Sequence, residues 1–299
     1  MIKHFLDIGH FDKKEIDSII LNAKLIKKNP QKYLNELNDK TLGLLFLKQS
    51  NRTRLSFTVG IQKLGGRAID LDLNSIGFGK RETEEDIIKT LSQYIDCLVI
   101  RNNDHKKLLK YASLNCLPII NGLSNYTHPC QTLADFLTIQ EKLGTIKNKK
   151  ISWIGDFNNV ARSLIQLQNI YKFELNVILP KQIINKNKES LLKLKKNNIL
   201  ISSDINKNIH NSHCVMTDVW LSMGEKNLKK KNYFKKFQID DKLMNLMNKK
   251  AIFMHCLPAN RNEEVTSSVI DGPQSVVWDQ AKNRMYVQQA ILKYIFDKK

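Results

Sequence analysis

The chain has 299 residues, of which 42% are hydrophobic, and this suits two globular domains with a sizeable core and excludes a disordered protein. No apolar run approaches the ~18 residues of a membrane span, and none near Met1 is long enough for a signal peptide, so we expect a cytoplasmic protein with no membrane partner. The formal net charge of +19 would suit nucleic-acid binding, but the lysines are spread among asparagines without a nucleic-acid-binding motif, and we predict no nucleic-acid partner.

Helix and strand signals alternate through the first half of the chain. Asp12 and Glu15 form a capping box that opens a helix ending before Pro30. Apolar runs then predict strands at 41–48, 67–73, 97–101 and 118–121, and helical periodicity predicts helices at 55–64, 83–95, 104–114 and 128–143. Strands separated by helices of this size predict a parallel sheet covered on both faces.

The pattern restarts after Gly144. Predicted strands follow at 151–155, 175–179, 199–203, 214–218, 251–256 and 275–278, and a final helix spans 283–296. We therefore predict an α/β protein with two domains, residues 1–147 and 148–299, and expect the helical segment 283–297 to pack back on the first domain.

A motif rich in hydroxyl and guanidinium groups, Ser50–Arg54, follows the first predicted strand. Backbone N–H groups at a helix start and the guanidinium of Arg52 can converge on one anion, so the motif is typical of a phosphate site. A serine cap followed by two exposed arginines is the alternative. Arg101 favours the phosphate site because it lies at the carboxyl end of its strand, where open parallel sheets bind ligands.

His128 and Gln131 lie at i and i+3 in the first turn of a predicted helix and so share one face. Together they suit a ligand with a carbamoyl group, because the histidine can donate to a carbonyl oxygen and the glutamine can bond an amide. A histidine before a proline can also serve only as a cap.

These two motifs resemble the carbamoyl-phosphate site of the aspartate/ornithine carbamoyltransferase superfamily. Three later segments resemble its ornithine branch: 218–224, 255–258 and 283–285. The resemblance covers essentially the whole chain. It implies two doubly wound parallel-sheet domains with the active site in the interdomain cleft, a homotrimer, and transfer of the carbamoyl group of carbamoyl phosphate to the δ-amine of ornithine. Arginine biosynthesis is the implied setting, with no cofactor and no metal.

The resemblance also implies a role for individual residues. The expected catalytic residues are Arg52, Arg101, His128 and Cys256. The expected carbamoyl-phosphate ligands are Ser50, Asn51, Arg52, Thr53, Arg101, His128, Gln131, Cys256, Leu257 and Arg284. The expected ornithine ligands are Asn159, Asp218, Ser222 and Met223.

Two positions depart from the family pattern. Asn51 stands where threonine is common, and Arg81 replaces the second glycine of the loop Gly79–Glu82, which bears on the loop's conformation and on any contact it makes across a subunit boundary. Five scattered cysteines without a C-x-x-C pair suit reduced thiols.

Some features of the sequence could also indicate other functions. His210, His213 and Cys214 could suggest zinc, but no second Cys/His pair is near them. The run 151–156 could open a nucleotide-binding unit, but it lacks the glycine pattern of a dehydrogenase. A non-catalytic anion-binding protein is a further alternative, and putrescine or N-acetylornithine is the alternative acceptor within the superfamily.

Overall fold

The chain forms two compact units in a computed structural model that describes residues 2–73, 76–79, 81–194, 196, 198–222, 225 and 227–297. Unit 1 comprises Met1–Leu133 and Asn283–Lys299, and unit 2 comprises Ala134–Lys282. The chain passes between them inside two helices, α5 (Pro129–Leu143) and α13 (Val277–Phe296). The domain boundary predicted from the sequence follows residue 147, beyond the end of α5.

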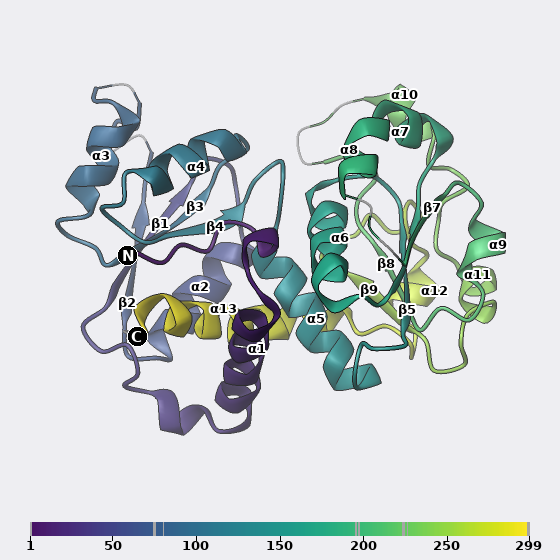
Figure 1. The fold of residues 1–299 in the computed structure, drawn as a ribbon, viewed down its shortest axis with the longest axis horizontal. Helices are drawn as coiled ribbons and strands as arrows, with labels where there is room; N and C mark the ends of the chain where they lie inside the picture. The colour runs from purple at the N-terminus through teal and green to yellow at the C-terminus, as the bar shows by residue number, and fades with distance from the viewer. Residues whose placement is uncertain are drawn as a thin grey trace. The chain divides into compact units, whose positions relative to one another are not determined.

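Unit 1 is built on a four-stranded parallel sheet with the strand order β2-β1-β3-β4. Its strands are β1 (Thr41–Phe46), β2 (Arg67–Leu71), β3 (Cys97–Arg101) and β4 (Ile119–Leu123). Its other elements are η1 (Ile8–His10), α1 (Lys13–Lys28), η2 (Pro30–Tyr33), α2 (Arg52–Gln62), α3 (Glu84–Leu91), α4 (His105–Ser113), the amino end of α5 and the carboxyl part of α13. Helices cover both faces of this sheet (Figure 1), as the buried strands predict.

Strand β1 is packed on both of its faces. All residues of β1 after Thr41 are buried, and a side chain at Gly43 would collide with Ile95 and Leu98. The capping box predicted at Asp12 is present, because the Asp12 carboxylate accepts from the Glu15 N–H and the Glu15 carboxylate accepts in return.

Unit 2 has a five-stranded parallel sheet with the order β7-β6-β5-β8-β9. Its strands are β5 (Lys150–Ile154), β6 (Glu174–Ile178), β7 (Ile199–Ser202), β8 (Cys214–Thr217) and β9 (Ile252–His255). Its helices, besides the ends of α5 and α13, are α6 (Asn159–Tyr171), α7 (Lys181–Lys186), α8 (Lys188–Leu194), α9 (Ile205–Ile209), α10 (Leu228–Asn232), α11 (Asp241–Asn245) and α12 (Ser267–Ile270). The two parallel α/β sheets confirm the predicted fold class.

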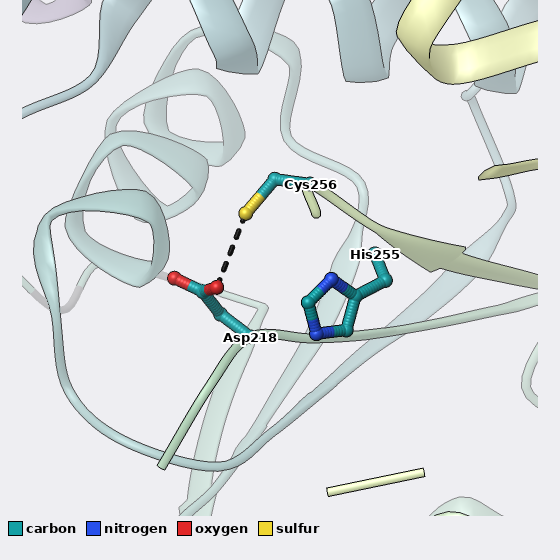
Figure 2. A group of neighbouring side chains, drawn as sticks. All are labelled: Asp218, His255 and Cys256. Carbon is teal, nitrogen blue, oxygen red and sulfur yellow. Dashed lines mark hydrogen bonds between the residues drawn. The ribbon is translucent and has the colours of Figure 1, made fainter. Parts of the chain in front are cut away.

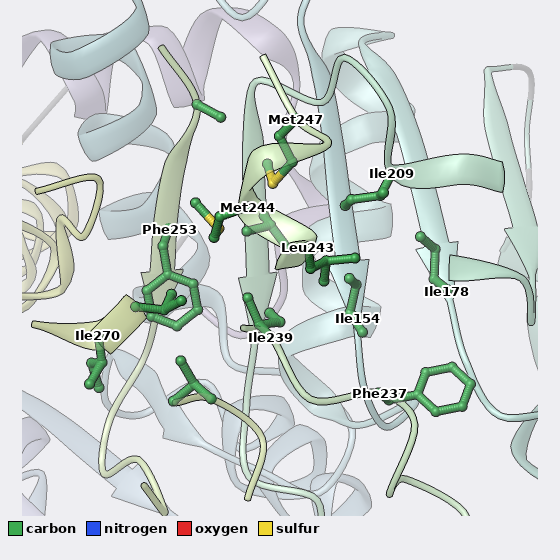
Figure 3. Close-up of a cluster of buried hydrophobic side chains, with 14 of the residues drawn as sticks. Ile154, Ile178, Ile209, Phe237, Ile239, Leu243, Met244, Met247, Phe253 and Ile270 are labelled. Atoms are coloured by element: carbon green, nitrogen blue, oxygen red, sulfur yellow. The ribbon is translucent and has the colours of Figure 1, made fainter. Parts of the chain in front are cut away.

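One core of unit 2 lies between its sheet and α11. Ile154 and Phe253, from two strands, pack with Leu243, Met244 and Met247 (Figure 3). This core fixes the strands whose carboxyl ends carry the polar motifs of the second half of the chain.

The predicted strand at 275–278 is wrong. Only Ser275 forms an isolated bridge, with Phe253, and α13 begins at Val277, six residues before the predicted start of the last helix. The β-branched pair Val276 and Val277 favours a strand locally, but both side chains are buried at a helix start, so tertiary packing overrides the local preference. None of the described helices is both long and apolar enough to cross a bilayer.

Candidate active site

The Ser50–Arg54 motif spans the end of the connection from β1 to α2 and the first residues of α2. Arg52 is the first residue of the helix, and the Asn51 side chain makes no capping hydrogen bond. Thr53 is buried, Ser50 and Arg52 are partly buried, and Asn51 is exposed. The first-turn N–H groups of an 11-residue helix are therefore presented beside an arginine and two hydroxyls, which is the environment that an anion needs.

Two further arginines lie in the same unit. Arg101 ends β3, where it pairs with Phe46 at the end of β1. Burial lowers the pKa of the Arg101 guanidinium, and the charge of Arg52 lowers it further. The buried Nε of Arg101 has no hydrogen-bond partner among the described residues. Arg284, on α13, donates from Nη2 to the Thr53 hydroxyl at 2.7 Å, so the last helix brings a third cation to the start of α2.

His128 lies within the electrostatic reach of all three arginines. It immediately precedes α5 and is 4% exposed. Burial lowers its pKa well below the usual 6.5, and the charges of Arg284, Arg101 and Arg52 act in the same direction. The imidazole is therefore neutral at pH 7 and serves as a hydrogen-bonding group. Gln131 is 1% exposed, and its N–H donates to the His128 carbonyl at 3.1 Å.

A buried asparagine that the sequence analysis missed holds the turn before His128. Asn121, inside β4, donates from Nδ2 to the Leu6 carbonyl at 2.9 Å and to the Thr127 hydroxyl at 3.2 Å. The Cys130 thiol contacts the Asn121 carbonyl at 3.5 Å, and burial raises its pKa to about 12, so this cysteine is a packing residue. An uncharged polar residue inside an otherwise apolar strand was the available signal for Asn121.

In unit 2, a second polar cluster surrounds Asp218, directly after β8. Asn158 donates from Nδ2 to Asp218 Oδ2 at 2.7 Å, and the Val219 N–H donates to Oδ1 at 2.8 Å. The Cys256 thiol, directly after β9, donates to the same Oδ1 at 3.2 Å (Figure 2). The structure thus brings together two predicted residues, Asp218 and Cys256, that lie on neighbouring strands.

Asn158 directly precedes Asn159, the predicted ornithine ligand, and was not itself predicted as a site residue. Asn158 caps α6, because its Oδ1 accepts from the N–H groups of Val160 and Ala161. Its Nδ2 is thereby turned toward Asp218. Asn159 is the first helical residue and is partly buried. An asparagine before a helical run is a recognisable cap, but its second partner lies 60 residues away.

The segment after Asp218 is tied down by a buried ion pair. Lys230 Nζ lies 2.7 Å from Asp156 Oδ2 and 3.0 Å from Glu225 Oε2, and both Lys230 and Asp156 side chains are at most 14% exposed. The N–H of the exposed Ser222 donates to Glu225 at 3.3 Å. The predicted Met223 lies outside the described residues.

His255 and Glu264 shape the backbone around Cys256. His255 Nδ1 accepts from the Leu257 N–H at 2.8 Å, which places the ring proton on Nε2, 3.1 Å from Glu264 Oε1. Both side chains are fully buried. Asp218, His255 and Cys256 offer atoms close enough for a metal ion. Both His255 nitrogens are already hydrogen-bonded, however, so the arrangement is built to orient the loop.

The other candidate sites take structural positions. His213 Nδ1 accepts from the Lys150 N–H at 3.2 Å, and His210 is exposed. The loop Gly79–Glu82 is described only in part, because Lys80 lies outside the described residues. Just beyond it, Glu84 contacts the Tyr111 hydroxyl at 2.6 Å and Lys107 Nζ at 2.8 Å.

Comparisons with known proteins identify the family of both halves of the chain. Residues 3–141 match the family model described as the carbamoyl-P binding domain of aspartate/ornithine carbamoyltransferase, and residues 147–295 match its Asp/Orn binding domain. An ornithine carbamoyltransferase of Bradyrhizobium diazoefficiens is 41% identical over 299 residues, covering 99% of this chain and 97% of the relative.

Solved structures extend the likeness to three dimensions. The ornithine carbamoyltransferase from Pyrococcus furiosus superposes with a TM-score of 0.91 at 38% identity, covering 97% of this chain and 96% of that one. The anabolic ornithine carbamoyltransferase from Campylobacter jejuni gives a TM-score of 0.88 at 35% identity, with coverage of 98% and 99%.

Proposed function

The chain belongs to the aspartate/ornithine carbamoyltransferase family, and from this premise we propose that it transfers the carbamoyl group of carbamoyl phosphate to the δ-amine of L-ornithine, giving L-citrulline and phosphate. The observation that carries the proposal is the group of three arginines, Arg52, Arg101 and Arg284, acting on one buried neutral histidine. Such a field attracts a phosphorylated substrate, and a neutral imidazole beside it suits a carbonyl group.

Carbamoyl phosphate occupies the unit 1 residues in this proposal. The Ser50 and Thr53 hydroxyls, the Asn51 backbone and Arg52 bind the phosphate, and Arg284 steadies Thr53 from α13. The carbamoyl end is then held by the donors Arg101, His128 and Gln131. His128 donates a hydrogen bond to the carbonyl oxygen and transfers no proton, because its lowered pKa makes imidazolium rare at pH 7.

Ornithine occupies the unit 2 residues. Its α-ammonium group pairs with the Asp218 carboxylate, and its α-carboxylate accepts from Asn159. Ser222 and Met223 complete the recognition of the α-amino acid end, while Cys256 and Leu257 lie near the reacting amine. Asp218 suits this role because it is partly buried and is held in place by Asn158 and Cys256 before any substrate binds.

The chemistry is an acyl transfer without a cofactor. The lone pair of the neutral δ-amine forms the new C–N bond, the carbonyl electrons move to oxygen, and the tetrahedral oxyanion is stabilised by Arg52, Arg101 and His128. The C–O bond to phosphate then breaks, and the amine proton leaves with the phosphate. The amine reacts after losing a proton, which nearby cations and burial both favour.

We further propose a role in arginine biosynthesis, in the cytoplasm, as a homotrimer. The biosynthetic direction is supported by the likeness to an enzyme named anabolic. Assembly is supported by exposed apolar side chains of unit 1, since Leu55 and Val59 on α2 and Ile69 on the edge strand β2 are 37% to 55% exposed. Light scattering of the purified chain tests the trimer.

A citrulline assay tests the proposed function. The purified chain should form citrulline from carbamoyl phosphate and ornithine, and it should use putrescine at least about a hundredfold less well, because putrescine has neither an α-ammonium group for Asp218 nor an α-carboxylate for Asn159. N-acetylornithine should be similarly poor, since acetylation removes the α-ammonium charge. Comparable turnover of either amine would overturn the assignment of ornithine as the acceptor.

A further inference from the structure

Strand β9, at one edge of the unit 2 sheet, ends at His255, immediately before Cys256. On its free side, the Phe253 N–H donates to the Gln274 carbonyl at 2.8 Å, and Phe253 accepts from the Val276 N–H at 3.0 Å. N–H groups alternate along a strand, so the His255 N–H points to the same free side. By then the chain has left the edge and begun α13, and among the described residues no backbone carbonyl accepts from this N–H.

A side chain replaces the missing backbone partner. Gln280, in the first turn of α13, accepts from the His255 N–H through Oε1 at 3.0 Å. Its Nε2 donates to Asp135 Oδ1, on α5, at 2.7 Å. All three residues are 1% exposed, so water does not compete with these bonds. A carboxylate can only accept hydrogen bonds, so Asp135 binds the NH2 group of the Gln280 amide. The amide oxygen of Gln280 is thereby turned toward β9.

The end of β9 sets the place of the Cys256 thiol. Cys256 follows His255 directly, and its thiol donates to Asp218 Oδ1 at 3.2 Å. The His255 ring binds the Leu257 N–H on the far side of the cysteine. If His255 shifted toward the unpaired edge of β9, Cys256 would therefore move relative to Asp218.

We propose that Gln280, oriented by Asp135, is a positioning residue that fixes the end of β9 and thereby holds Cys256 against Asp218. The kinetic part of this proposal rests on the proposed function, because it assigns ornithine to Asp218 and Cys256. The geometric part concerns only the position of the Cys256 thiol, and thiol reactivity measures it without catalysis.

The first experiment combines kinetics with thiol alkylation in Gln280→Met, which keeps the side-chain volume. All variants carry Cys116→Ser, because Cys116 is the other cysteine that is not fully buried. We expect kcat/KM for ornithine to fall about ten- to a hundredfold while the Kd of carbamoyl phosphate stays within about twofold. The rate of Cys256 alkylation by iodoacetamide should change at least about threefold, because the thiol loses its fixed geometry.

Gln289→Met is the matched control. Gln289 is also a buried glutamine of α13, but it donates to the Gly60 carbonyl in unit 1. It should lower the melting temperature without changing the alkylation rate of Cys256. If Gln280→Met lowered only the melting temperature, as the control does, the pair would be merely structural and the proposal overturned.

A charge swap gives a second, independent test. Gln280→Glu keeps an acceptor for the His255 N–H but sets a carboxylate against Asp135, so activity should fall as pH rises and the shared proton is lost. Asp135→Asn combined with Gln280→Glu restores one donor and one acceptor. The double variant should recover the wild-type alkylation rate and most of the activity at pH 8.

These results separate the two proposals. A double variant no better than Gln280→Glu alone would overturn the positioning role, and this test decides alone if Gln280→Met fails to fold. A wild-type chain that binds carbamoyl phosphate but forms no citrulline would contradict the proposed function. The alkylation rates would still decide the role of Gln280.

Discussion

The two polar clusters handle charge in opposite ways. In unit 1, Arg52, Arg101 and Arg284 act on one neutral histidine, burial penalises the charge of Arg101, and one Arg101 nitrogen is buried without a partner in the described structure. In unit 2, the Asp218 carboxylate already accepts hydrogen bonds from Asn158 and Cys256. The first cluster brings positive charges together, whereas in the second cluster the single negative charge of Asp218 already has hydrogen-bond donors before a substrate binds.

This difference predicts different consequences of mutation. Like charges held together in a buried place repel one another until an anion joins them, so the first cluster should supply electrostatic stabilisation to binding and to the transition state. A carboxylate that is already satisfied gains less from a new partner, but its position is fixed. The second cluster should therefore govern the choice of amine more than the chemical step.

The largest expected effect is from Arg52→Ala, which removes a cation from unit 1. It should lower kcat by about two to three orders of magnitude, because a donor that stabilises the developing oxyanion is lost. Steady-state kinetics on a variant with a wild-type circular dichroism spectrum measures this. Arg261→Ala, which breaks an exposed ion pair with Asp271, is the control and should keep full activity. A loss of less than tenfold in Arg52→Ala would place the phosphate elsewhere.

Asp218→Asn should act on one substrate only. It keeps the shape of the side chain but removes the charge that pairs with the α-ammonium group, so kcat/KM for ornithine should fall about a hundredfold. The Kd of carbamoyl phosphate, measured by calorimetry, should be unchanged. Asp240→Asn, at the amino-terminal cap of α11, makes the same substitution where only a helix depends on it and should be silent. Equal losses for both substrates would remove the distinction between the clusters.

The sequence predicted this contrast only in part. Buried strands and polar residues after them follow local rules, so the parallel sheets and the positions of Ser50–Thr53, Arg101 and Asp218 could be predicted. The partners of these residues could not. Asn158 lies 60 residues from Asp218, and Gln280 lies 145 residues from Asp135, and no local periodicity encodes such pairs.

The misassigned segment 275–278 illustrates the same limit. Its β-branched and aromatic residues favour a strand, and Ser275 does form a bridge to Phe253. Packing then turns the chain into α13 at Val277, and this early start is what places Gln280 beside His255. Gln280 could not be predicted as part of the last helix, because the local preference of this segment for a strand is real and only tertiary packing overrides it.

Asn158→Ala sharpens the contrast by testing whether Asp218 depends on being held. The variant loses both a helix cap and a hydrogen bond to the carboxylate, so kcat/KM for ornithine should fall about tenfold and stability by about 1 kcal/mol. Asp204→Ala is the matched control, because Asp204 caps α9 through the Lys207 N–H and has no place in the proposed site. Urea unfolding should show similar destabilisation of the two variants, and only Asn158→Ala should lose ornithine activity. Equal losses of ornithine activity in the two variants would mean that Asn158 acts only as a helix cap and does not hold Asp218.

The smallest expected effect is a pH dependence that originates in unit 1. The pKa of His128 is well below 6.5 in the folded protein because the ring is buried and Arg284, Arg101 and Arg52 surround it, whereas the unfolded chain titrates near 6.5. Between these two values the unfolded state binds more protons, so the contribution to stability is complete above about pH 6.5 and is lost as pH falls. One such group contributes a slope of up to about 1.4 kcal/mol per pH unit. His128→Gln should therefore flatten the fall in the free energy of unfolding measured by urea between pH 7 and pH 5. Part of the slope should persist, because burial also lowers the pKa of His4, His105 and His213. An unchanged slope in His128→Gln would mean that the arginines of unit 1 do not hold this imidazole neutral.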